Sequence, residues 1–210
     1  LLIDLTQLRE AGWLTDEDII PDPAFKDERI NYPAVQRFRM AKLRLAAREF
    51  FADVRRDARK SFSEFCTDAS DWLEDYALFM ALDKKHGAVW QEWPAALAQR
   101  KPKALQEAAV ALTDECEFWR FCQWCFYRQW AALKNYANTR GVEIIGDMPI
   151  FVSPHSADVW PINHYSIWIA RGSHASLPGC RPITSAPADN AGVIPCTSGR
   201  LMKRKTTAGG

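Results

Sequence analysis

The sequence lacks any hydrophobic run long enough to cross a membrane. None of its apolar stretches approaches the roughly 20 consecutive residues that a membrane-spanning helix needs. It also lacks an excess of charge of either sign, because the formal net charge is +1. One basic run, RRDARK near Arg55, is flanked by acids and has no interleaved aromatic residues, which favours a solvated helix end over a nucleic-acid patch. We therefore predict neither a membrane nor a nucleic-acid partner.

The first residues, LLIDLTQL, contain neither a methionine nor a basic segment. They do not resemble a signal peptide, and we expect them to lie within a longer protein. Six cysteines in a long chain with nine tryptophans do not form the pattern of a small secreted, disulfide-bonded domain. Reduced thiols and a cytoplasmic location are the prediction.

The chain also has too few metal ligands at suitable spacing. Cys122 and Cys125 form a CxxC pair with Cys116 upstream, but a second pair at the spacing of a zinc site is missing outside the last fifty residues. The pair lacks the preceding strand of a thioredoxin-like motif, and His155 and His164 are not spaced for one helical face. We predict buried thiols within a helix, no metal and no cofactor. Zinc held by the CxxC pair is the alternative, and stoichiometric zinc would reveal it.

What the sequence contains is a series of helical patterns. Hydrophobic residues make up 48% and charged residues 25%, which is typical of a globular domain. Apolar residues recur at helical spacing and are separated by Gly and Pro, with one helix start expected at Pro33 after Asn31 and one stop at Gly87. The expected helices cover about residues 5–14, 33–50, 61–86, a short segment from Pro94, and 103–140, the last either as one helix or as two with a bend near Thr113.

The centre of the last expected helix, CEFWRFCQWCFYRQW, is apolar on most of its faces. A helix that is apolar nearly all round is buried. Its polar side chains then need partners inside the protein. These are Arg120, Gln123, Arg128 and Gln129.

The segment from Gly141 to Trp160, GVEIIGDMPIFVSPHSADVW, has a different pattern. It predicts a helix stop at Gly141, a buried strand beginning with the β-branched residues of 142–145, and then a polar loop. Asp147 follows the apolar run, and the carboxyl end of a strand is where α/β-barrel enzymes place the residues of their sites. Asp158 and Trp160 follow in the loop, which favours a site over a simple loop cap at Asp147.

IIGDMPIFV followed by SADVW resembles the amylomaltases, the 4-α-glucanotransferases of the α-amylase clan. Upstream segments agree in the same order: LLIDL, DYALFMAL, WPAAL and FYRQWAALKNYANTRG. The resemblance covers about residues 1–160 and implies an α/β fold, a partial (β/α)₈ TIM barrel with a large helical insertion at about 33–113 that leaves this chain mostly helical. It also implies transfer of α-1,4-glucan segments by a retaining double displacement, with no cofactor and a maltooligosaccharide as substrate.

The resemblance implies substrate-binding roles for Asp147, Asp158 and Trp160. Asp147 matches the acid after the third barrel strand that lines the sugar site, and the other two match the loop motif that follows. The family's nucleophile, acid/base and transition-state-stabilising acid lie on later strands, so no catalytic residue is assigned here and we expect the chain alone to be inactive. His155 departs from the family, which more usually has an acid at this point in the loop.

The last fifty residues differ in composition from the rest. Residues 161–210 contain six of the 27 Lys and Arg but one of the 26 Asp and Glu, and 5 of 12 prolines without hydrophobic periodicity. A flexible basic tail is one interpretation. The other is translation in the wrong frame, because the codons permit, one base out of step, the strings QPLFDLD, AGVPPDYFS and GQRWGNPLY with which an amylomaltase continues. We predict the loss of one base at the Trp160–Pro161 junction and a disordered tail after it.

A different class of function stays open. The chain could be a non-enzymatic helical binding module whose aromatic helices and basic tail hold a partner. This alternative predicts a compact protein with a tail protected from proteases, whereas the fragment interpretation predicts rapid loss of the tail after about Trp160.

Overall fold

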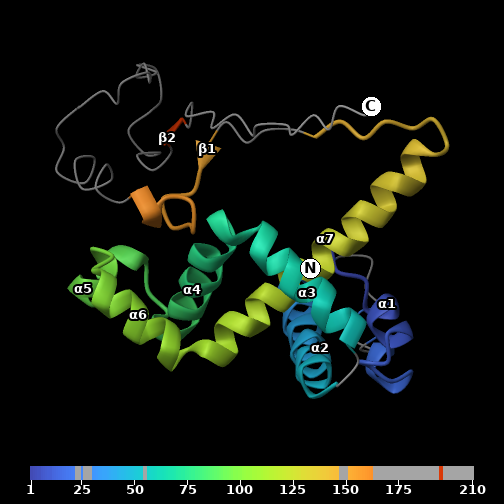
Figure 1. Cartoon of the computed structure of the whole chain (residues 1–210), viewed down its shortest axis with the longest axis horizontal. Coiled ribbons are helices and arrows are strands. Elements are labelled where there is room, and N and C mark those ends of the chain that lie inside the picture. Colours follow the sequence, from blue (N-terminus) through green and yellow to red (C-terminus); the bar gives the residue numbers. More distant parts are fainter. Residues whose placement is uncertain (22–24, 26–29, 54–55, 147–150, 163–193, 196–210) are drawn as a thin grey trace. The chain divides into compact units, whose positions relative to one another are not determined.

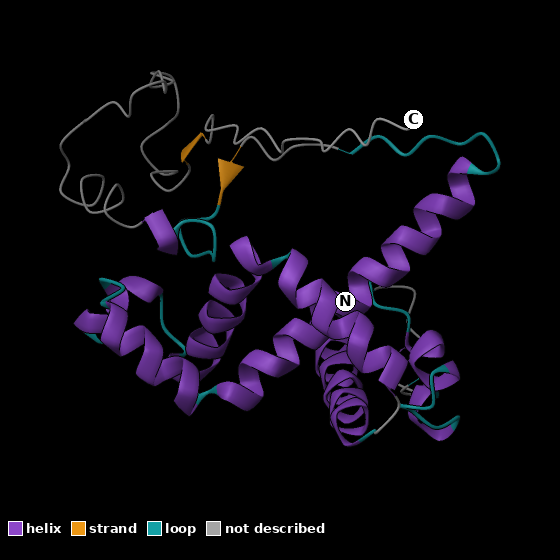
Figure 2. Ribbon diagram, in the orientation of Figure 1, coloured by secondary structure: helices purple, strands orange, loops and turns teal. Residues whose placement is uncertain are grey.

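The computed structural model describes residues 1–21, 25, 30–53, 56–146, 151–162 and 194–195. These residues are mostly helical, as the sequence predicts (Figure 2). They divide into two compact units, of which the first comprises Leu1–Lys85 with Gln106–Ile145 and the second His86–Leu105 with the part from Gly146 onwards. None of the helices in the described ranges combines the length and apolar character that crossing a membrane requires.

Most helices belong to the first unit, and its longest helix runs from Thr113 to Asn138 (Figure 1). In chain order the helices are α1 (Leu5–Glu10), η1 (Glu17–Ile19), α2 (Tyr32–Ala52), α3 (Arg56–Asp68), α4 (Ser70–His86), η3 (Trp90–Glu92), α5 (Ala95–Ala98), α6 (Pro102–Ala111), α7 (Thr113–Asn138) and η4 (Trp160–Ile162).

The helix start expected near residue 33 and the stops expected near residues 86 and 140 are confirmed, whereas the first helix, expected to reach about residue 14, ends at Glu10. The side chain of Asn31 accepts a hydrogen bond from the backbone N–H of Ala34 at 3.1 Å and caps α2. Gly87 and Gly141 follow α4 and α7 with φ of 62° and 73°, the left-handed conformation in which glycine ends helices. The break near Thr113 is present between α6 and α7, whereas the single helix expected over residues 61–86 is two helices, α3 and α4, that meet at Ala69.

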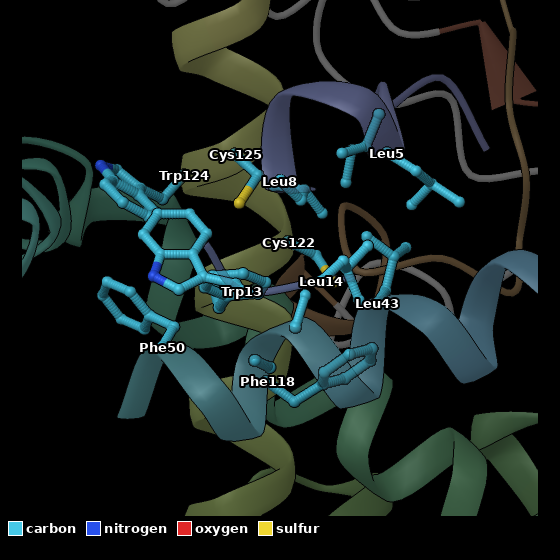
Figure 3. Close-up of a cluster of buried hydrophobic side chains, with 14 residues drawn as sticks. Leu5, Leu8, Trp13, Leu14, Leu43, Phe50, Phe118, Cys122, Trp124 and Cys125 are labelled. Atoms are coloured by element: carbon cyan, nitrogen blue, oxygen red, sulfur yellow. The ribbon is translucent and has the colours of Figure 1, made fainter. Parts of the chain in front are cut away.

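The core of the first unit forms where α7 packs against α1, α2 and α3 (Figure 3). Phe50 of α2 lies at its centre and is fully buried. Its ring centroid lies 5.1 Å from those of Trp13 and Phe121 and 5.0 Å from that of Trp124. Such close aromatic packing adds about 0.5–1.5 kcal/mol per pair beyond the burial of apolar area. The prediction that the centre of α7 is buried is therefore confirmed for Phe118, Phe121 and Trp124, whereas Tyr127 and Trp130 of the same segment are 44% and 39% exposed.

The polar residues of α7 find the partners that their position requires. Arg120 Nε donates to Glu74 Oε1 at 3.0 Å. Gln129 Nε2 donates to the backbone oxygen of Asp4 at 3.0 Å, while its Oε1 accepts the backbone N–H of the same residue at 2.7 Å. The guanidinium of Arg128 lies 4.5 Å from the ring centroid of Trp124. Arg120, Arg128 and Gln129 thus each have a partner within the first unit.

The predicted buried strand directly after Gly141 is wrong. Residues 142–146 form no strand, and Val142 and Ile145 are 55% and 90% exposed. A strand is stable only when neighbouring strands pair its backbone N–H and C=O groups. Within the described ranges, the one strand pairing is antiparallel, between β1 (Phe151–Val152) and β2 (Ile194–Pro195), so these residues by themselves form no barrel.

The register of this pairing sets Phe151 opposite Pro195 and Val152 opposite Ile194. β2 lies inside the last fifty residues, for which the sequence predicts disorder. The rest of that segment, 163–193 and 196–210, lies outside the described residues.

Candidate functional site

Two of the three predicted site residues, Asp158 and Trp160, fall on the loop that follows β1. Asp147 lies outside the described residues. Asp158 and Trp160 are described, and both belong to the segment 153–160 in the second unit. Asp158 is exposed, whereas Trp160 has no exposed surface. The loop thus directs one predicted residue to solvent and the other into the interior.

Hydrogen bonds within the loop explain these opposite directions. The hydroxyl of Ser156 accepts the backbone N–H of Val159 at 3.2 Å, and the carbonyl of Ser156 accepts the N–H of Trp160 at 3.1 Å. This closes a tight turn, in which the exposed Asp158 lies between the half-buried Ala157 and the buried Val159. A carboxylate in this position can accept hydrogen bonds from the hydroxyl groups of a ligand.

Two hydrogen bonds from Trp90 of η3 hold the loop. The backbone N–H of Trp90 donates to His155 Nδ1 at 3.1 Å, and its indole N–H donates to the carbonyl of Pro154 at 2.7 Å. An imidazole nitrogen that accepts a hydrogen bond is unprotonated, so this contact uses the neutral ring with its proton on Nε2. His155 therefore supports the loop by accepting this hydrogen bond from η3.

Trp160 is enclosed by residues around α5. Its indole N–H donates to the carbonyl of Leu97 at 3.2 Å, and the ring of Trp93 meets it edge-on with 5.7 Å between centroids. The guanidinium of Arg100 lies over its ring, 4.3 Å from the centroid. Trp160 is therefore an anchor that fixes the end of the loop in this structure.

The helical pattern of the sequence does not identify these supporting residues. Trp90 and Trp93 precede the short helix expected from Pro94, and Arg100 lies near the end of that helix. Two tryptophans three residues apart, directly before the helix-starting Pro94, were the available signal.

The CxxC pair has the chemistry of buried thiols, as predicted. Cys122 and Cys125 are buried in α7, and burial raises the pKa of Cys122 to about 12 and that of Cys125 well above its ordinary value. Reactive cysteines need the opposite shift, because the thiolate is the nucleophile and the metal ligand. Among the described residues, no group of three or more His, Cys, Asp and Glu side chains could hold a metal ion.

Comparison with known proteins gives a consistent result. The chain matches the family model described as 4-alpha-glucanotransferase over residues 1–184. It is 45% identical over 160 residues to the 4-alpha-glucanotransferase of Thermus thermophilus, a match covering 76% of this chain and 31% of the relative. The corresponding enzyme of Synechocystis is 39% identical over 160 residues, 76% of this chain and 32% of the relative.

A solved structure shows the same likeness in three dimensions. The amylomaltase from Streptococcus agalactiae in complex with acarbose matches with a TM-score of 0.72 and 33% identity, over 78% of this chain and 33% of that one. The chain therefore spans about a third of the length of the relatives that it matches.

Proposed function

The chain belongs to the 4-α-glucanotransferase family, and we propose that the protein to which it corresponds transfers α-1,4-glucan segments to glucose or to other glucans. The family match over residues 1–184 is the observation that carries this proposal. The likeness to the amylomaltase structure supports the (β/α)₈ barrel as the fold of the intact protein. In that fold residues 1–160 contribute early barrel segments and a helical insertion at about 33–113.

The proposed reaction is a retaining double displacement. One carboxylate forms a glycosyl-enzyme while a second carboxylic acid protonates the leaving sugar, and a glucan rather than water accepts the glycosyl group. We assign both carboxylates, and the acid that stabilises the transition state, to later barrel strands than the 210 residues contain. The chain by itself is then inactive.

The contribution of this chain is one wall of the sugar site. Asp147 and Asp158 supply carboxylates that accept hydrogen bonds from sugar hydroxyl groups. Trp160 shapes the wall, and its burial supports an indirect role in which it fixes the loop that presents Asp158.

Incubation of the purified chain with maltotriose tests the assignment of the catalytic acids. We expect neither glucose nor longer glucans, measured by anion-exchange chromatography, after a reaction time in which a complete 4-α-glucanotransferase converts the substrate. Release of both products by the chain alone would refute the proposed inactivity.

We also propose that residues 161–210 are read out of frame after the loss of one base at the Trp160–Pro161 junction. The composition of this segment supports the proposal, as does the length of the match to both bacterial relatives, 160 residues. The family match continues to residue 184, and this part of the match favours the in-frame interpretation of residues 161–184 instead. The coding DNA decides: stop codons or unrelated residues in the alternative frame would refute the frame change.

Limited proteolysis separates the enzyme fragment from the alternative, a non-enzymatic helical binding module. The fragment proposal expects early cleavage after about residue 160 and survival of α1 to α7. A binding module that uses its basic tail expects that tail to survive as long as the helices do.

A further inference from the structure

Arg100 has an unusual backbone conformation for its residue type. Among the described residues it is the one non-glycine residue with a positive φ, 53°. Its N–H donates to the carbonyl of Leu97 at 2.9 Å, and the N–H of Lys101 donates to that of Ala96 at 2.8 Å, so Arg100 occupies the left-handed position that ends α5. Glycine is the residue usually found there, because a Cβ atom is disfavoured in this conformation. An arginine therefore needs a compensating role.

The compensating contact is with Trp160. The guanidinium of Arg100 lies 4.3 Å from the centroid of this ring, and the ring has no exposed surface. A cation over an aromatic face is attracted by the ring's quadrupole, and the attraction is stronger where the pair is shielded from water. Glycine would end α5 with less strain but would leave the ring without the cation.

Trp160 connects Arg100 to the loop that carries Asp158. Its backbone N–H is bonded to the carbonyl of Ser156, which closes the turn that carries the exposed Asp158. At the other end of the same loop, Trp90 holds Pro154 and His155. The turn is thus fixed at both ends by one short stretch, η3 to Arg100.

We propose that Arg100 is a positioning residue, which acts through Trp160 to hold the turn that presents Asp158 to a glucan. Its role in the sugar site rests on the function proposed above, whereas its hold on the turn does not. The contact of the guanidinium with the ring offsets the strain of the left-handed backbone at Arg100.

Hydrogen exchange in the full 210-residue chain tests the hold on the turn. We expect amide exchange in residues 153–162 to be about tenfold faster in Arg100→Gly and Arg100→Ala than in the wild type, because the cation over the ring is lost. Arg100→Lys keeps the charge and should recover part of the protection. The matched control is Arg140→Ala, which removes a guanidinium 3.6 Å from the ring centroid of Tyr136 in the first unit and should leave this segment unchanged.

Two results would overturn the proposal. Exchange in residues 153–162 that is equal in the wild type and in Arg100→Gly shows that Arg100 does not hold the turn. Slower exchange in Arg100→Gly shows that relief of backbone strain is the dominant effect at this position.

Calorimetric titration with maltotriose then tests the link to the sugar site. Where the wild-type chain binds, we expect at least a fivefold loss of affinity in Arg100→Gly and no change in Arg140→Ala. Equal affinity of the wild type and Arg100→Gly, despite faster exchange, overturns the role of Arg100 in sugar positioning. A wild-type chain that does not bind maltotriose counts against the proposed sugar wall instead, and the exchange measurement still decides whether Arg100 holds the turn.

Discussion

Burial decides the chemistry of the cysteine side chains of α7. Cys122 and Cys125 are three residues apart, a spacing that occurs in metal and redox sites, but both thiols lie in the apolar core. Desolvation penalises the thiolate and raises the pKa of both groups. The pair is therefore a part of the packing and not a reactive site.

This predicts slow alkylation of the two thiols over a wide pH range. Because the pKa of Cys122 in the folded chain is about 12, iodoacetamide labelling at this position should stay low from pH 7 to pH 10. A brief denaturation in urea should expose both thiols and make labelling complete. Peptide mass spectrometry measures the labelled fraction at each site, and the half-buried Cys66 serves as the internal reference.

The raised pKa values also have a consequence for stability. Folded thiols that hold their protons more tightly than unfolded ones stabilise the fold below the unfolded pKa of about 9, and this contribution is lost as the pH rises toward about 12.

Labelling of Cys122 and Cys125 that rises steeply near pH 9 in the native chain would contradict the account.

At the scale of elements, the first turn of α7 joins three helices. Glu115 accepts hydrogen bonds from Arg44 of α2 at 2.6 and 3.0 Å and from Lys84 of α4 at 2.7 Å. Partial burial alone would raise the pKa of this carboxyl group, but the bonds from the two cations outweigh it and the pKa is lowered. The charge of Glu115 thus stabilises the contact between these helices.

Glu115→Ala should lower the free energy of unfolding by about 2 kcal/mol, because it leaves Arg44 without its bidentate partner in a partly buried position. Urea unfolding followed by circular dichroism measures this change. Asp114→Ala is the control, since Asp114 lies in the same turn but is exposed, and its effect should stay within about 0.5 kcal/mol. Equal effects of the two substitutions would show that the helix dipole, rather than the ion pairs, is responsible.

The helices could be predicted from the sequence because their signals are local. The cap at Asn31, the stops at Gly87 and Gly141 and the break near Thr113 each depend on residues within one turn. The prediction of a strand that begins at residues 142–145 is wrong for the opposite reason, because strand formation depends on partners distant in sequence. The same limit applies to the site: Asp158 and Trp160 were found in one loop motif, but the contact of Trp160 with Arg100 joins residues far apart in the chain.

At the scale of the whole molecule, the described structure leaves apolar side chains uncovered. The end of α7 carries Trp130, Leu133 and Tyr136, which are 39%, 54% and 57% exposed, and Ile145 beyond it is 90% exposed. Exposed apolar side chains of this size promote association when they form a patch.

We expect the chain to self-associate through this end of α7. Leu133→Lys removes the apolar contact at little cost in helix propensity and should shift the chain toward the monomer in sedimentation velocity. Asn135→Lys adds the same positive charge at a neighbouring exposed position and should change the distribution much less. Equal effects of both substitutions would mean that charge repulsion, not loss of apolar surface, controls association.

The most direct test restores one base after the Trp160 codon within the complete coding sequence, including whatever codes for residues before Leu1, and measures maltotriose disproportionation by the product. The account predicts a longer protein that releases glucose and forms longer glucans, while the 210-residue chain does neither under the same conditions. A base-restored product that is soluble, contains the barrel strings expected after residue 160 and still leaves maltotriose unchanged would contradict the proposed function.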